Sequence, residues 1–148
     1  MRMFKLADDA PHSARITLAG DMLAVRDGLQ RLFAMQPLCD LTEAGRGTVE
    51  IVLAEALNNI VEHAYARHSG TIEVALQLAH PDLLCQISDS GLPMPGESLP
   101  LGNLPPVGIA DDLPEGGFGW FLIRTLTREL NYRRDNGLNL LSFRLDAI

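Results

Sequence analysis

The sequence has few of the features that mark secreted, membrane-spanning or metal-stapled proteins. Only two of its 148 residues are cysteines, Cys39 and Cys85, and they form no CxxC pair, so we expect neither a zinc site nor a disulfide framework. Both lie among apolar residues and are expected to be buried as small hydrophobic side chains. No apolar run approaches the roughly 18 residues of a membrane span, and the N-terminus has none long enough for a signal peptide. A cytoplasmic protein without membrane contact is therefore expected.

The chain also lacks an excess of basic residues. Its net charge is −7 and its twelve Lys and Arg residues are mostly scattered, whereas a protein that binds duplex nucleic acid needs a basic surface to neutralise phosphates. We therefore expect no direct nucleic-acid binding. An acidic chain can still bind a nucleotide, because backbone N–H groups and a metal ion can hold the phosphates. The length and the 47% hydrophobic content are typical of one globular domain, here expected over residues 1–148.

The spacing of apolar residues predicts an α+β protein. Helices and hairpins are segregated along the chain, which favours a two-layer sandwich with helices on one face of a mixed, mostly antiparallel sheet. The expected elements are a strand over 14–18, a helix over 21–35 capped by Asp21, a helix over 42–67 capped by Thr42 with a break near 45–47, strands over 71–78 and 83–88, a helix over 118–128, and strands over 129–134 and 138–145. The apolar positions of the first helix are expected to be Leu23, Leu29, Leu32 and Phe33.

A segment rich in glycine and proline, over about residues 90–117, separates the two patterned halves. Unpatterned loops of this length inside a compact domain are usually functional lids or disordered. Because the segment joins two well-patterned halves, we expect a flexible lid rather than a linker between domains.

The second helix carries the first group of candidate site residues. Glu55, Asn59 and His63 are spaced i, i+4, i+8, so a helix places them on one stripe. The remainder of this segment is apolar, and buried polar groups are costly unless they are satisfied. The stripe either faces a ligand cleft or, together with Asn58 and Glu62, forms a solvated polar face.

Two further groups flank the lid segment. Asp89 ends a predicted strand and precedes Gly91; its carboxylate suits an exocyclic amine, although the pattern also fits a plain turn. Gly116, Gly117 and Gly119 open the third helix. Glycines there free the first N–H groups to face an anion, although a lid hinge has the same composition.

The three groups, in this order, resemble the nucleotide-binding boxes of the GHKL ATPase superfamily, which includes gyrase, Hsp90, histidine kinases and MutL. The segment EALNNIVEHAY is similar to the N box of the RsbW-like anti-sigma-factor kinases, DSGLP to their G1 box, and GGFGWFLIR to their G2 segment. The other branches would need additional domains or dimerisation helices, for which we expect no room in this chain. The resemblance implies the GHKL (Bergerat) sandwich fold, ATP and Mg²⁺ as cofactors, and serine/threonine kinase activity.

The resemblance also implies roles on the adenine side. Asp89 would accept a hydrogen bond from the adenine amino group, with Gly91 beside the ring. Pro93 stands where many members of the superfamily have glycine, a variant found in the RsbW-like group. Ser142, on the last strand, would help to hold adenine through water.

On the phosphate side, Asn59 would coordinate Mg²⁺ and Glu55 would orient or deprotonate the attacking hydroxyl. His63 and the glycines of the third group, Gly116, Gly117 and Gly119, would lie at the phosphates. The sequence between Ser90 and Gly117 contains no Lys or Arg. No lid contact to the γ-phosphate can therefore be assigned, and Arg124 is only a distant candidate.

The implied partners are a STAS-type antagonist of an anti-sigma factor and a sigma factor, and relatives of this group are commonly homodimers. The competing hypotheses are a nucleotide-binding switch module without phosphotransfer, a structural domain with a degenerate pocket, and a component of a two-component-like pathway with another acceptor. The presence of Glu55 favours the kinase over the switch. The presence of Asn59, Asp89 and the glycines argues against a degenerate pocket.

Overall fold

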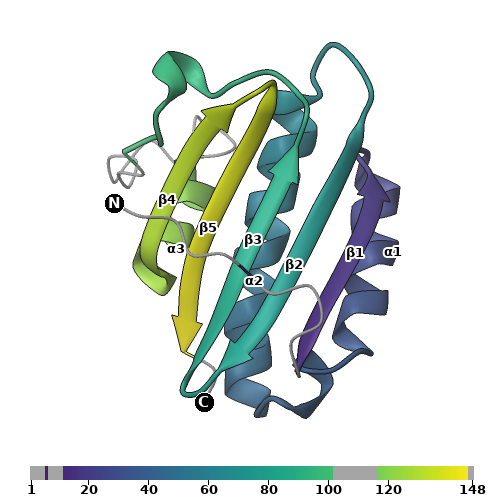
Figure 1. Ribbon diagram of the computed structural model, residues 1–148, viewed down its shortest axis with the longest axis vertical. Coiled ribbons are helices and arrows are strands. Elements are labelled where there is room, and N and C mark those ends of the chain that lie inside the picture. Colours follow the sequence, from purple (N-terminus) through teal and green to yellow (C-terminus); the bar gives the residue numbers. More distant parts are fainter. Residues whose placement is uncertain (1–5, 7–11, 102–116, 147–148) are drawn as a thin grey trace, which may run out of the picture.

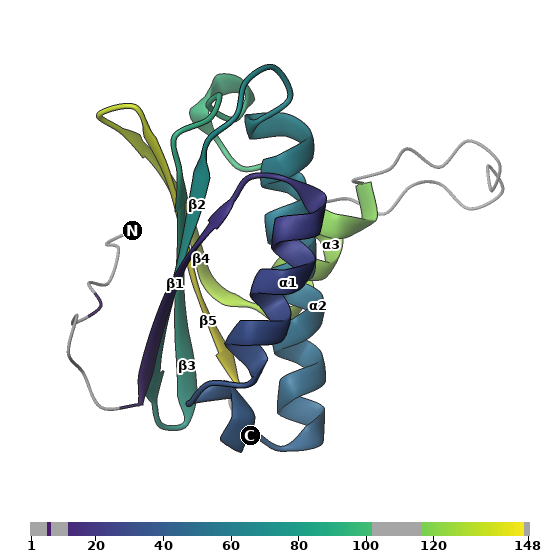
Figure 2. The same ribbon diagram turned by 90° about the vertical axis from the view of Figure 1, so that its right-hand side faces the viewer.

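The computed structural model describes residue 6, residues 12–101 and residues 117–146. Within this part of the chain, five strands form one sheet in the order β1-β2-β3-β5-β4, and helices α1, α2 and α3 cover one of its faces (Figure 1, Figure 2). The elements are β1 (Ser13–Ala19), α1 (Met22–Phe33), α2 (Glu43–Asn59), β2 (Thr71–Ala79), β3 (Asp82–Asp89), α3 (Gly117–Leu126), β4 (Arg128–Asp135) and β5 (Leu138–Asp146). The predicted α+β sandwich is confirmed, and each pair of neighbouring strands is antiparallel.

The two long helices begin where the sequence predicts. The Asp21 carboxylate accepts the N–H of Ala24 at 2.8 Å, and the Thr42 hydroxyl accepts the N–H of Gly45 at 3.1 Å, as N-cap residues do. The predicted break near 45–47 is wrong, because α2 runs through it as one helix. Gly45 is buried there, and tertiary context can override the weak helix propensity of glycine.

Helix α2 ends at Asn59 rather than at residue 67, and a π-helical turn (Ile60–Ala64) follows it. The N–H of Tyr65 donates to the carbonyl of Ile60 at 3.0 Å, which is the i→i−5 bond of a π-helix. Such turns are rare and occur frequently at functional sites. The turn changes the angular spacing after Asn59, so the predicted single stripe ends there.

The core lies between the sheet and the helices. Phe143 and Leu145 of β5 and Leu53 and Leu57 of α2 are among its fully buried side chains. The prediction that Leu23 is one of the core-facing apolar positions of α1 is wrong, because this residue is 69% exposed. The residues of α1 that are buried are Val25, Gly28 and Leu32.

Three local features concern the outer face of the sheet, the β4–β5 turn and the two cysteines. On the face opposite the helices, Leu6 is buried against Ala75 and Leu84. The β4–β5 turn has positive φ values at Asn136 (51°) and Gly137 (77°), as the Asn-Gly hairpin signal predicts. The expectation that both cysteines are buried holds for Cys85 and fails for Cys39, which is exposed.

The packing of β5 against the helices gives a stability prediction. Phe143→Ala removes a fully buried ring and should lower the free energy of unfolding by about 3–5 kcal/mol. Leu138→Ala, in the same strand but at a side chain 42% exposed, should change it by no more than about 0.5 kcal/mol. Urea unfolding followed by circular dichroism measures both. Equal effects of the two substitutions would contradict the placement of β5.

Candidate functional site

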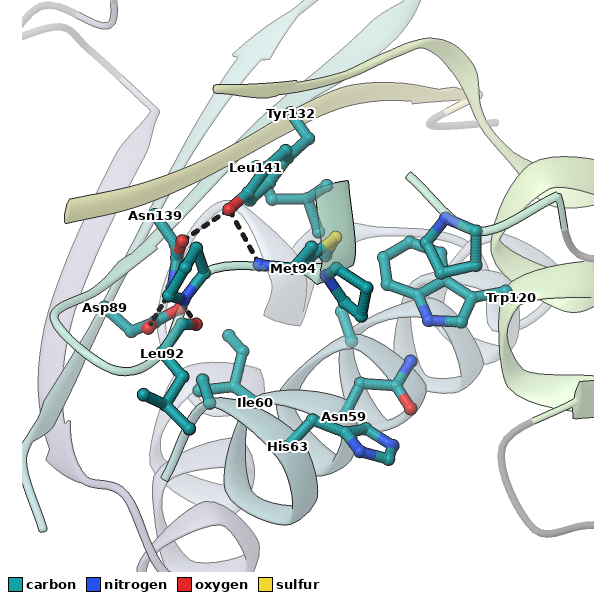
Figure 3. A pocket seen from close by; sticks show the side chains of 15 residues that line it. Asn59, Ile60, His63, Asp89, Leu92, Met94, Trp120, Tyr132, Asn139 and Leu141 are labelled. Carbon is teal, nitrogen blue, oxygen red and sulfur yellow. Dashed lines mark hydrogen bonds between the residues drawn. The ribbon is translucent and has the colours of Figure 1, made fainter. Parts of the chain in front are cut away.

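A cavity of about 250 Å³ opens between the C-terminal end of α2, the segment after β3, and the β4–β5 hairpin (Figure 3). Its walls are mainly apolar, with a few polar groups that face inward. These properties are typical of a small-molecule site. The lining includes Asn59, Ile60, His63, Asp89, Leu92, Pro93, Met94, Trp120, Tyr132, Asn139 and Leu141. Four predicted site residues, Asn59, His63, Asp89 and Pro93, thus meet at one cavity although they come from two separate segments.

Asp89, at the end of β3, is buried, with 5% of the residue exposed. Its Oδ1 atom accepts the N–H of Gly91 at 2.9 Å and the Nδ2 of Asn139 at 2.8 Å. Burial raises the pKa of Asp89, and the donors on Asn139 and Gly91, together with Arg134, oppose this shift. Both of these hydrogen bonds end on one oxygen, so Oδ2 is the oxygen left to accept a ligand donor.

Asn59 supplies the other buried polar group of the cavity. Its side chain is 7% exposed, and Nδ2 has no hydrogen-bond partner among the described residues. A buried amide that lacks a partner costs roughly 1–3 kcal/mol, so a ligand that pairs with it gains affinity. The His63 imidazole lies at the same wall but is 69% exposed, which places it at the mouth of the cavity.

The third predicted group, at the start of α3, meets the first at Glu55. A Cβ atom added to Gly119 would lie 2.7 Å from Oε2 of Glu55 and 3.6 Å from Nδ2 of Asn59. Gly119 therefore lets the first turn of α3 approach the carboxylate of α2. Gly117 is the first residue of α3, whereas Gly116 lies outside the described residues, as does most of the predicted lid (residues 102–116).

Gly91 is required for packing inside the protein. A Cβ atom at this position would lie 2.4 Å from the carbonyl oxygen of Ala64, and the N–H of Leu92 donates to the same oxygen at 2.8 Å. The segment after β3 is thereby joined to the π-helical turn. This contact accounts for the glycine without reference to a ligand ring.

Several described candidates do not line the cavity: Glu55, Gly91, Gly117, Gly119, Ser142 and Arg124. Ser142 follows the cavity-lining Leu141 in β5, and adjacent residues of a strand point to opposite faces. Ser142 therefore faces away from the cavity, so the structure does not support a contact of Ser142 with a ligand there. Arg124 donates from Nε to the carbonyl of Pro100 at 2.8 Å.

The sequence indicated no role for Tyr65, whose hydroxyl group links the start of β2 to the residue after β3. The Tyr65 hydroxyl donates to the carbonyl of Thr71 at 2.6 Å and accepts the N–H of Ser90 at 2.9 Å. Its ring fills the space where Gly20 and Gly70 lack side chains. Gly20 and Gly70 were the sequence feature that could have indicated this packing, because each follows a predicted strand or helix.

Comparison with known proteins identifies the family. The model of the histidine kinase-like ATPase domain matches residues 17–145. The chain belongs to this family. The serine-protein kinase RsbW of Bacillus cereus (strain AH187) is 31% identical over 130 residues, which cover 86% of this chain and 72% of that protein. The RsbW protein of Bacillus mycoides (strain KBAB4) has the same identity and coverage. The resemblance to the RsbW-like group is therefore confirmed.

A solved structure was also found by comparison of folds. The histidine kinase domain of the Erythrobacter litoralis EL346 blue-light activated histidine kinase aligns with a TM-score of 0.49 and 18% identity. The alignment covers 70% of this chain and 45% of that one. Within the described residues, no helix has the length and hydropathy that a membrane span requires.

The contact of Gly91 with Ala64 gives a second stability prediction. Gly91→Ala inserts a methyl group where backbone atoms already lie, and such overpacking should lower the free energy of unfolding by about 1–3 kcal/mol. Gly47→Ala is the matched control, because nothing lies within 4 Å of its added Cβ in helix α2. It should raise the free energy of unfolding by about 0.5–1 kcal/mol. Thermal unfolding that shifted in the same direction for both variants would contradict this packing.

Proposed function

We propose that this protein is an ATP- and Mg²⁺-dependent serine/threonine protein kinase. Its substrate would be a STAS-type antagonist of an anti-sigma factor, and it would alternately bind a sigma factor in the cytoplasm. The identity with serine-protein kinases RsbW over 86% of the chain supports this class of activity. The main structural support for this proposal is that Asn59 and Asp89 line the same cavity, with Glu55 one helical turn before Asn59.

The cavity fits an adenine nucleotide. Its apolar walls suit a flat base, and Oδ2 of Asp89 can accept the exocyclic amine. Pro93 and Leu92 form the rim after β3. The base would lie against this rim, with the phosphates toward α3.

The residues near α3 fit the phosphates and a metal ion. The amide of Asn59 offers an oxygen, which Mg²⁺ prefers as a ligand, and an unpaired N–H that a phosphate oxygen can accept. No group of three His, Cys, Asp or Glu side chains in the described parts of the chain is arranged to hold a metal, so the phosphates would supply further ligands. When bound, Mg²⁺ would neutralise phosphate charge. The backbone N–H groups at Gly117 and Gly119, in the first turn of α3, would face the phosphates, with Gly116 just before them and His63 at the mouth.

Glu55 is the proposed general base. The Ser or Thr hydroxyl of the protein substrate would attack the γ-phosphorus, forming a new O–P bond while the bond to the β–γ bridging oxygen breaks and ADP leaves. Glu55 would orient this hydroxyl and accept its proton. Positioning and charge neutralisation contribute most of the rate enhancement in phosphoryl transfer. Proton transfer to Glu55 is therefore expected to contribute a smaller part of the rate enhancement than the groups that position the nucleotide and neutralise its charge.

A phosphotransfer assay with labelled ATP, Mg²⁺ and a candidate STAS protein tests the proposal. Glu55→Gln should retain nucleotide binding and lose about 10²–10⁴-fold in transfer, because it removes only the base. Asn59→Ala should weaken Mg²⁺–ATP binding at least about tenfold, because it removes the metal ligand. Asn58→Ala, a neighbouring amide outside the cavity lining, should behave as the unmodified protein.

Two results would contradict the kinase assignment. Tight binding of ATP by the unmodified protein, without label on any Ser or Thr of a partner, would favour the nucleotide-binding switch module. Transfer that persisted unchanged in Glu55→Gln would remove the proposed base from the mechanism.

A further inference from the structure

The β4–β5 hairpin carries three polar side chains that neither the predicted boxes nor the proposed mechanism uses. Tyr132 and Arg134 of β4 lie opposite Leu141 and Asn139 of β5, and Asn139 in turn lies opposite Asp89 of β3. Asn139 is 6% exposed. A buried amide at this point links the hairpin to the carboxylate of the cavity (Figure 3).

The hydrogen bonds of Asn139 use both ends of its amide. Nδ2 donates to Oδ1 of Asp89 at 2.8 Å and to the carbonyl of Leu92 at 2.9 Å. Oδ1 accepts from the Tyr132 hydroxyl at 2.6 Å and from Nη1 of Arg134 at 3.1 Å. Every donor and acceptor site of this amide is therefore occupied.

The orientation of the amide follows from its two neighbours on β4. The guanidinium of Arg134 can only donate. The Tyr132 hydroxyl accepts the N–H of Met94 at 3.1 Å, which leaves its own proton for Oδ1 of Asn139. Because both neighbours donate to the oxygen, the amide nitrogen has to face Asp89.

The same side chains also hold the rim of the cavity by its backbone. Arg134 donates to the carbonyl of Gly91 at 2.6 Å, Asn139 to the carbonyl of Leu92, and the N–H of Met94 donates to Tyr132. Residues 92–95 provide one wall of the cavity, directly after Gly91. The hairpin therefore fixes both the carboxylate and the wall beside it.

We propose that Tyr132 and Arg134 are positioning residues that set the choice of nucleobase through Asn139. By turning the Asn139 amide nitrogen toward Oδ1 of Asp89, they leave Oδ2 as a fixed acceptor for the 6-amino group of a purine. A 6-oxo purine would place a carbonyl oxygen against this acceptor, and two acceptors cannot form a hydrogen bond. The inference rests on the proposed function, since it assumes that the cavity binds the base of ATP.

The test is the ratio of the dissociation constants for ATP and ITP, measured by calorimetry with Mg²⁺ on the full chain. The two nucleotides share phosphates and sugar, so a loss of general packing weakens both equally and leaves the ratio unchanged. The unmodified protein should prefer ATP, and Tyr132→Phe and Arg134→Met should each reduce this preference about tenfold, since each removes one donor that orients Asn139. Arg133→Met is the control, because Arg133 is exposed and faces Asp135 at 3.8 Å.

The possible results separate the proposed role of Tyr132 and Arg134 from the proposed function. A smaller preference in Tyr132→Phe and Arg134→Met, with the ratio unchanged in Arg133→Met, supports it. Tyr132→Phe keeps the ring, so it carries the test if Arg134→Met does not fold. An unmodified protein that prefers ATP, with the same ratio in folded Tyr132→Phe, overturns this inference alone. An unmodified protein that binds no ATP overturns the proposed function as well.

Discussion

The structure around the cavity depends on the burial of one carboxylate, that of Asp89. A buried carboxylate requires donors, and here they come from Gly91 in the next turn and from Asn139 across the sheet. The antiparallel pairing of β3 with β5 supplies the second donor by placing Asn139 opposite Asp89. Both donors bind Oδ1, so they hold the carboxylate in place without using Oδ2.

The glycines and the π-helical turn bring the other residues to this carboxylate. Gly91 allows the segment after β3 to lie against Ala64, and the freed carbonyl of Ala64 accepts the N–H of Leu92. Gly119 allows α3 to approach Glu55. Small residues at these two contacts bring the segment after β3 and the first turn of α3 close to α2 and the π-helical turn.

The sequence predicted the elements well where local signals were strong. The caps at Asp21 and Thr42 and the Asn136–Gly137 turn are formed by neighbouring residues, so they can be recognised without the fold. The break in α2 and the exposure of Leu23 were mispredicted because packing decides both. Ser142 was assigned by resemblance, and the pleat of β5, which depends on strand register, turns it away from the cavity. The roles of Tyr132, Arg134 and Asn139 required the same register and were therefore not visible in the sequence.

The proposed function depends on a hydrogen bond from the amino group of adenine to Oδ2 of Asp89 in this cavity. A crystal structure with Mg²⁺ and a non-hydrolysable ATP analogue measures this contact directly. We expect the exocyclic nitrogen to lie about 2.7–3.2 Å from Oδ2, with Asn139 still bonded to Oδ1. An adenine ring bound outside the cavity, or one that contacts Asp89 through neither oxygen, would contradict the account.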